Sequence, residues 1–158
     1  MARGLTYVAT FTAVSVSVAQ DLFSVLAAAN VPVEILWARL SAEGVTAPAE
    51  LRLNVKRLSA TAALGSLGTV ITPQEKGQRS ARAAVSTVHA NDTTRATSTG
   101  TTGILHSESA QVLNGWDYPL IPELFDALSP GEAWVFGLEA APGAAAVLSG
   151  TVCFREMV

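Results

Sequence analysis

The feature that most constrains the fold is an alternation of apolar and polar residues with a period of two. It is clearest in ELRLNVKRL, where Leu51, Leu53 and Val55 point one way and the residues between them point the other. A helix would scatter the charges of this stretch around its whole circumference. We therefore predict a strand with one face in the core and one face in solvent.

Similar alternation recurs along most of the chain, and β-branched residues crowd the first segment. The expected strands cover residues 6–18, 21–27, 33–40, 50–58, 83–89, 104–112, 134–139 and 147–156, with a short one at 69–71 inside a long connection over 60–82. Short strands separated by turn signals, without a convincing helix, indicate an all-β fold. We expect residues 1–158 to form a single-domain antiparallel β-sandwich with long loops, for which a jelly roll is the favoured version.

Two tryptophans lie in apolar alternations and are expected in the core. Trp37 shares one face of its strand with Ile35, and because the opposite face is apolar too, this strand is expected to be covered on both sides. Trp134 opens a second apolar strand near the C-terminus. Cys153, the single cysteine, lies in an apolar run and is expected to be a small buried hydrophobe.

The N-terminal segment has an early Arg3 and a Ser17-Val18-Ala19 sequence that resembles a signal-peptidase site. Its apolar residues alternate with Thr and Ser, however, which favours a strand over a secretory signal. No run approaches 18 consecutive apolar residues, so no membrane partner is expected.

The composition argues against several classes of function. Charged residues make up 15% of the chain, the net charge is −3, and no Lys/Arg run follows a phosphate backbone, so nucleic-acid binding is not expected. One cysteine excludes an intramolecular disulfide and a Cys-based zinc finger. Phosphate-binding loops and the Gly-x-Ser-x-Gly elbow are missing. The sequence therefore predicts no catalytic residue, no cofactor and no enzyme.

The only two histidines, His89 and His106, bracket a threonine-rich stretch. If residues 85–112 fold back about Ala96-Thr97, the two rings face each other across an antiparallel pair, about 4.5–5.5 Å apart at Cβ. A metal would need a third ligand, and only Asp92 and Glu108 are near in sequence. We expect the histidines to be solvated and incidental, with a metal-dependent enzyme as the alternative.

The segment from Trp116 to Leu128 is largely apolar, and Pro119 and Pro122 stiffen it. We predict an edge strand followed by an irregular arm, with at most one helical turn over 122–128. The candidate assembly residues are Trp116, Tyr118, Leu120, Ile121, Leu124 and Phe125, followed by Thr97 and Thr99 of the threonine-rich stretch. Replacing Leu124 and Phe125 with Ser is expected to weaken assembly. Alternatively, Trp116 and Tyr118 pin the edge of the fold by packing, or they form an exposed stacking platform for a sugar.

The order of segments is similar to that of a known group of proteins. A first strand like YVATFTAVSVSVAQDLFSVLA, then ELRLNVKRL, a Thr-rich hairpin ending ILHSESAQV, then GWDYPLIPE and a closing GEAWVFGLEAAPGAAAVLSGTVCFRE together resemble small virion proteins of tailed phages and prophages. The resemblance covers nearly the whole chain and rests on layout, without a sharp motif. It implies a β-sandwich that assembles as an oligomer, and it transfers no catalytic residue.

The expected function is therefore that of a phage structural protein. The resemblance implies a capsid decoration (cement) protein that binds the major capsid protein on the outside of the head and associates with itself, as a trimer rather than a dimer. Its expected location is the virion, assembled in the host cytoplasm. A tail or fibre-attachment protein and a carbohydrate-binding β-sandwich module are the alternatives.

Overall fold

The computed structural model describes residues 4–44, 49–77, 82–119, 121 and 124–157, and these form an all-β structure. A short 3₁₀ helix, η1 (Val112–Asn114), interrupts the strands. The strands are β1 (Leu5–Val16), β2 (Gln20–Leu26), β3 (Val33–Glu43), β4 (Glu50–Leu58), β5 (Ala62–Ala63), β6 (Thr69–Ile71), β7 (Gln74–Glu75), β8 (Thr87–Asp92), β9 (Thr97–Ser98), β10 (Thr102–Gln111), β11 (Trp116–Pro119), β12 (Asp126–Leu128), β13 (Ala133–Leu138) and β14 (Ala146–Glu156).

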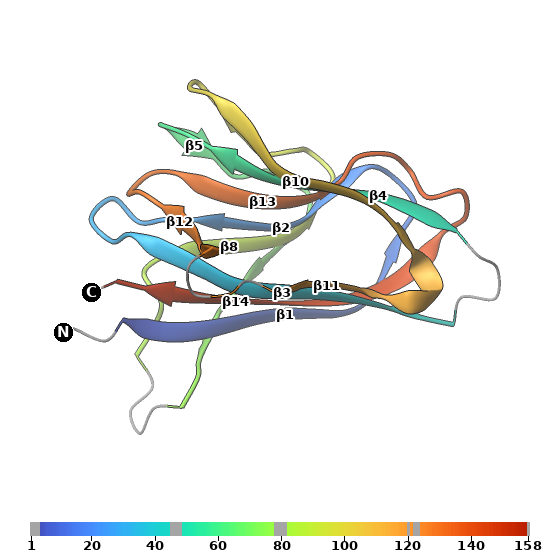
Figure 1. Ribbon diagram of the computed structural model, residues 1–158, viewed down its shortest axis with the longest axis horizontal. Helices are drawn as coiled ribbons and strands as arrows, with labels where there is room; N and C mark the ends of the chain where they lie inside the picture. Colours follow the sequence, from blue (N-terminus) through green and yellow to red (C-terminus); the bar gives the residue numbers. More distant parts are fainter. Residues whose placement is uncertain (1–3, 45–48, 78–81, 120, 122–123, 158) are drawn as a thin grey trace.

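Two antiparallel sheets pack face to face as a sandwich (Figure 1). One sheet has the order β11-β3-β14-β1-β7, with β12 also paired to β3, and the other has the order β10-β4-β13-β2-β8-β6. The first four strands alternate between the two sheets, so each connection between them passes from one sheet to the other. The predicted all-β sandwich is confirmed. Its jelly-roll version stays a prediction.

The core lies between the sheets and contains the inward residues that alternation predicts. Leu51, Leu53 and Val55 of β4 are buried, while Arg52 is exposed. Trp134 of β13 belongs to this core, and Cys153 of β14 is buried as expected, although it is opposite the outward-facing Trp37. The predicted short strand at 69–71 is present as β6. The strand expected at 83–89 lies later in the chain, at Thr87–Asp92, because its pairing with β2 extends to Asp92.

Bulges in β1 and β3 shift which residues face the core. In β3 the register with β14 changes between Ile35 and Trp37, so Leu36 is the extra residue and the inward positions pass from Ile35 to Ala38. Trp37 therefore faces outward and is only half-buried, with Arg39 Cζ and Lys76 Nζ each 5.8 Å from its ring centroid. The prediction of a core Trp37 in a strand covered on both sides is wrong.

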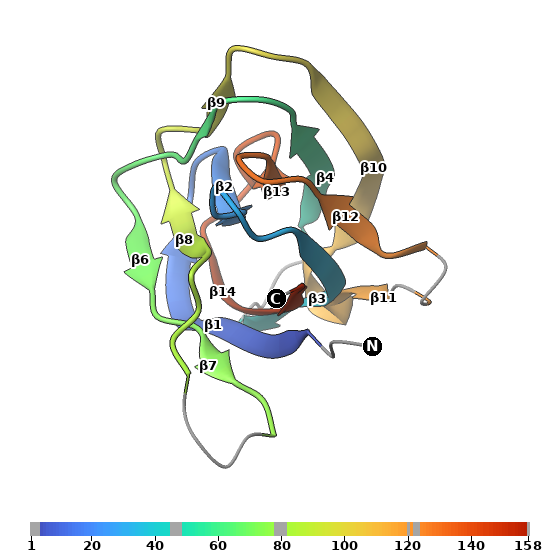
Figure 2. The same cartoon turned by 90° about the vertical axis from the view of Figure 1, so that its left-hand side faces the viewer.

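A third, smaller layer covers part of the outer face of the β10–β6 sheet. It consists of the connection 60–68 and the threonine-rich residues 93–100, joined by the β5–β9 pair and by a bridge between Ser66 and Thr94. We call these two segments the flap; Figure 2 shows β9 outside the main strands. Beneath the flap lies a small apolar cluster of Leu58, Ala133 and Val135.

Candidate assembly surface

The segment that the sequence predicts as an arm is anchored at both ends to the same edge of the sandwich. β11 pairs with Trp37–Leu40 of β3, and β12 pairs with Val33–Ile35 of the same strand. The predicted edge strand is therefore present as β11. The predicted helical turn is wrong at its end, because 126–128 form β12, and its positions 122–123 lie outside the described residues.

A glycine makes the entry into β11 possible. Gly115 follows η1 with φ = 67°, a conformation that favours glycine, and a Cβ at this position would lie 2.8 Å from the carbonyl oxygen of Leu40. The chain thus turns directly against β3 before Trp116 enters the sandwich.

Trp116 belongs to the interior of the chain. Its side chain is buried, and its ring stacks on Phe136 at a centroid distance of 4.5 Å and on Tyr118 at 5.4 Å. Tyr118 is partly buried and lies 6.5 Å from the ring of Trp134. The exposed platform is therefore wrong for Trp116, and the two rings pack at the edge of the sandwich, as the packing alternative expects.

Two carboxylates hold the polar atoms of this aromatic cluster. Glu108 Oε2 accepts a hydrogen bond from Trp116 Nε1 at 3.0 Å and lies 3.0 Å from His106 Nε2. The contacts with His106 and then Trp116 lower the pKa of the Glu108 carboxyl. Asp126 Oδ2 accepts from Trp134 Nε1 at 2.9 Å and from the Tyr118 hydroxyl at 3.3 Å.

Burial is the largest influence on the pKa of the second carboxylate, Asp126. It raises the pKa of Asp126, and burial together with the charge of Asp126 raises the pKa of Tyr118 to about 12. Tyr118 therefore stays protonated at physiological pH and keeps its hydrogen bond to Asp126. Both carboxylates thus serve to fix indole and phenol groups in place.

The aliphatic tip of the arm, by contrast, faces solvent. Ile121 is 58% exposed and Leu124 is 64% exposed, and the backbone N–H of Leu124 donates to the carbonyl of Ile121 at 2.8 Å. Phe125 is partly buried, and Leu120 lies outside the described residues. Of the six arm residues named from the sequence, Ile121 and Leu124 are the ones described as largely exposed.

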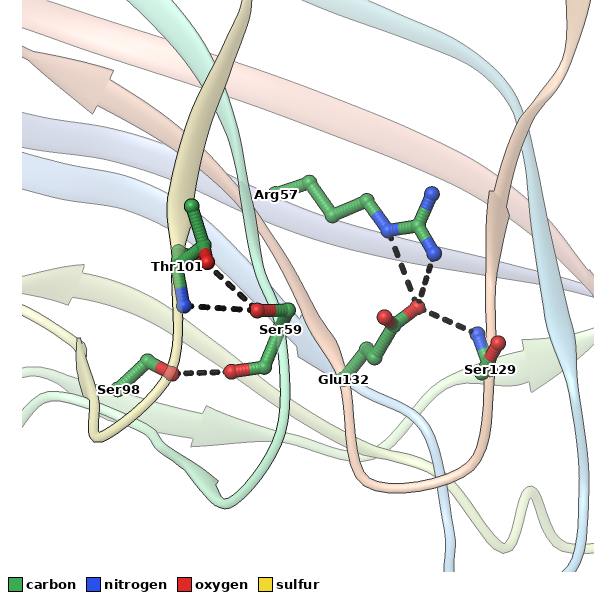
Figure 3. A network of polar contacts seen from close by, with 6 residues as sticks. All are labelled: Arg57, Ser59, Ser98, Thr101, Ser129 and Glu132. Carbon is green, nitrogen blue, oxygen red and sulfur yellow. Dashed lines mark hydrogen bonds and ion pairs between the residues drawn. The ribbon is translucent and has the colours of Figure 1, made fainter.

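Thr97 and Thr99 lie on the flap, and both side chains are exposed. Thr97 is opposite Ala63 in the β5–β9 pair, and the Thr99 hydroxyl contacts that of Thr61. The chain beside them is held by the network in Figure 3. There Thr101 N donates to Ser59 Oγ at 2.8 Å, the Ser98 hydroxyl donates to the Ser59 carbonyl, and Glu132 joins Arg57 to Ser129 N.

The flap is tied down by two buried aspartates whose role the sequence did not reveal. Asp21 and Asp92 are directly opposite each other across β2 and β8. Asp21 Oδ2 accepts from Ala96 N at 2.7 Å, and Asp92 Oδ1 accepts from Gly68 N at 3.0 Å. Each aspartate thus holds one of the two flap segments. Alternation alone gave no signal, because aspartate is a residue type that is mostly exposed.

The two histidines are not opposed. β8 and β10 are separated in their sheet by β2, β13 and β4, which places His89 and His106 about 19 Å apart at the usual spacing of neighbouring strands. His89 Nδ1 lies 3.1 Å from Asp92 Oδ2, and His106 lies beside Glu108 and Tyr118. The hypothesis that the two histidines face each other across a hairpin is therefore wrong. Within the described residues, no group of three metal-ligating side chains occurs.

A shallow groove of about 530 Å³ lies on the outer face of the β11–β7 sheet. Hydroxyl groups of Thr10, Ser41, Ser149 and Thr151 line it, and Leu113 stands on its rim. Arg39 Nε and Asp117 Oδ1 form an exposed ion pair 3.0 Å apart at the groove. The lining offers donors and acceptors without net charge.

No family model, curated protein or solved structure matches this chain. Among the residues described, the structure contains no helix with the length and apolarity needed to span a membrane.

Proposed function

We propose that the chain is a structural protein of a phage virion, and specifically a capsid decoration protein that binds the outside of the head. One observation carries the proposal: the sandwich closes its own aromatic core yet presents the aliphatic pair Ile121 and Leu124 at the tip of a loop anchored at both ends. Exposed aliphatic side chains between two strands that are both paired with β3 suit a permanent contact with another protein surface. The low charge of the chain agrees with a surface partly hidden in an assembly.

In this proposal the partners are the major capsid protein and further copies of the chain, and no step of chemistry is required. Binding to the assembled shell stabilises it by linkage. The trimer expected from the sequence stays a prediction. Placement in the tail or at a fibre attachment is the nearest variant, and electron cryomicroscopy of the particle that carries the chain separates it from placement on the head. Absence of the chain from such purified particles by mass spectrometry contradicts both versions.

Replacing Ile121 and Leu124 together with Ser is expected to reduce binding to particles at least tenfold, because burial of two aliphatic side chains contributes roughly 3 kcal/mol or more. We test Ile121 and Leu124 in preference to the pair Leu124 and Phe125 chosen from the sequence. Phe125 is partly buried, and its loss would also disturb the fold. Co-sedimentation with particles lacking the chain measures the effect.

The matched control for this pair is Val70→Ser together with Leu67→Ser, which also removes two exposed aliphatic groups, but at and just before β6, which lies across the molecule from β11 and β12 (Figure 2). Equal loss of binding in both double variants, with unchanged unfolding temperatures, counts against the arm tip as the contact.

A carbohydrate-binding module remains the second candidate, and the groove at Arg39 and Asp117 is the observation that favours it. An ion pair flanked by hydroxyl groups offers paired donors and acceptors to sugar hydroxyls. If this function holds, a glycan array gives hits, and Asp117→Ala weakens them at least tenfold. Glu50→Ala, an exposed carboxylate on β4, should leave binding unchanged. An array without hits removes this candidate.

A further inference from the structure

The strand β10 is an open edge. It pairs with β4 on one side, and among the described residues no strand pairs with its other side. Figure 1 shows β10 along the outer rim of its sheet. An unpaired edge presents a row of backbone N–H and C=O groups that a further strand can complete.

The side chains of β10 leave this edge unusually accessible. Over ten residues, Ala110 is the one buried position, and Ile104 and Leu105 are 61% and 43% exposed. Natural edge strands are commonly protected by lysine, by proline or by being short. β10 has none of these three features, and the one recognised edge protection in its backbone is a single bulge at Leu105. A ten-residue strand with one buried side chain contributes little to the core of the domain. We take this as an indication that β10 contacts another protein chain.

The charges of β10 indicate which partner fits. An interface about a two-fold axis must be complementary to itself. β10 carries one histidine and one carboxylate, His106 and Glu108, two residues apart on the same face. In an antiparallel pairing of two copies centred on Ser107, each His106 is opposite Glu108 of the second copy. Shifting the centre to His106 or to Glu108 instead places identical groups opposite each other, which is unfavourable for the carboxylates.

Glu108 has a free acceptor for this contact. Its two hydrogen bonds within the chain, from Trp116 and with His106, both use Oε2, and no described residue bonds to Oε1. A histidine ring N–H of a second copy can therefore donate to Oε1 without breaking the contacts that hold Trp116 in place.

We infer that two copies of this chain join through their β10 edges, antiparallel and in the register centred on Ser107, so that one continuous sheet runs through both copies. The inference concerns the chain alone, and it stands or fails independently of the proposed virion function. A two-fold contact gives a dimer, which is an alternative to the trimer expected from the sequence, and the oligomeric state measured below decides between them.

Cysteine trapping tests the register directly. In this pairing Ser107 is opposite Ser107 of the second copy, at a Cα separation of about 4.5–5.5 Å, which a disulfide spans. Ser109 is exposed on the same face of the same strand, but the two copies of Ser109 would be about 14 Å apart, too far to bridge. The native Cys153 is buried and gives little background.

The expected result is that Ser107→Cys, oxidised under mild conditions, runs as a covalent dimer on a non-reducing gel while Ser109→Cys runs as a monomer. Crosslinking of both variants to the same extent, of Ser109→Cys alone or of neither overturns the inference. Far-UV circular dichroism of the reduced proteins checks that both variants keep the fold.

Sedimentation of the unmodified chain provides a second readout. A dimer that dissociates on dilution is expected, and His106→Glu, which places two carboxylates opposite each other, should raise the dissociation constant at least tenfold. Thr12→Glu, which adds the same charge at an exposed site on β1, should leave it unchanged. A strictly monomeric or trimeric native chain overturns the inference.

Discussion

Replacing Trp116 with Ala is expected to destabilise the domain by about 3–5 kcal/mol, the usual range for removing a buried aromatic side chain. The ring is buried, stacks on Phe136 and Tyr118, and donates a hydrogen bond to Glu108. Its loss leaves a cavity at the edge of the sandwich. Because small domains have a total stability of about 5–15 kcal/mol, a large part of the margin disappears. Urea-induced unfolding followed by circular dichroism measures the change.

Leu113→Ala is the matched control, because Leu113 lies three residues away and is 55% exposed. Its replacement should change the free energy of unfolding by less than about 0.5 kcal/mol, as for most surface substitutions. If Trp116→Ala leaves stability unchanged and instead abolishes binding to a partner, Trp116 is an interface residue, as the sequence suggested, and the packing argument fails.

Replacing Asp92 with Ala is expected to cost about 3 kcal/mol and to release one segment of the flap. The carboxylate is almost fully buried, accepts from Gly68 N and lies within hydrogen-bond distance of His89 Nδ1. Its removal leaves a buried N–H without an acceptor, which costs about 1–3 kcal/mol, in addition to the lost contact with the histidine. Unfolding curves give the free energy, and hydrogen exchange at Gly68 reports release of the flap.

Asp117→Ala is the control for this second substitution, since Asp117 forms an ion pair with Arg39 in which both side chains are at least 60% exposed. Exposed pairs contribute about 0–1 kcal/mol. Similar losses for Asp92→Ala and Asp117→Ala, with exchange at Gly68 unaltered, contradict the idea that a buried aspartate anchors the flap.

The parts of the fold that the sequence predicts well are those in which strand alternation is uninterrupted. β4 follows the pattern from Leu51 to Val55, so its inward residues could be named in advance. Trp37 could not, because a bulge at Leu36 reverses the alternation, and a bulge depends on the partner strand β14 as much as on β3 itself.

Strand pairing also could not be predicted from the sequence. The opposed histidines required a local fold-back, but β8 pairs with β2 and β10 pairs with β4, strands about 50 to 70 residues away in sequence. No local pattern contains that information. The same limit hid the aspartate anchors, since Asp21 becomes buried only when the flap, from a distant part of the chain, covers it.

The arm was predicted in outline and corrected in detail. Its apolar content correctly marked a segment that leaves the regular strands, but composition does not say which residues turn inward. The pairing of β11 with β3 decides this: Trp116 and Tyr118 enter the aromatic cluster, while Ile121 and Leu124 lie in the loop between two anchored strands.

The pairing of β1 with β14 has a mechanical consequence. These strands are antiparallel neighbours, and their register begins with Leu5 opposite Glu156, so the segments that precede β1 and follow β14 leave from the same end of one ladder (Figure 1). Tension that pulls those segments apart therefore breaks the hydrogen bonds between β1 and β14 one pair at a time, starting at Leu5 and Glu156. Load applied along β3 and β14 instead shears many bonds together. The domain is therefore expected to unfold at a lower force when it is pulled through its two ends than when it is pulled along β3 and β14.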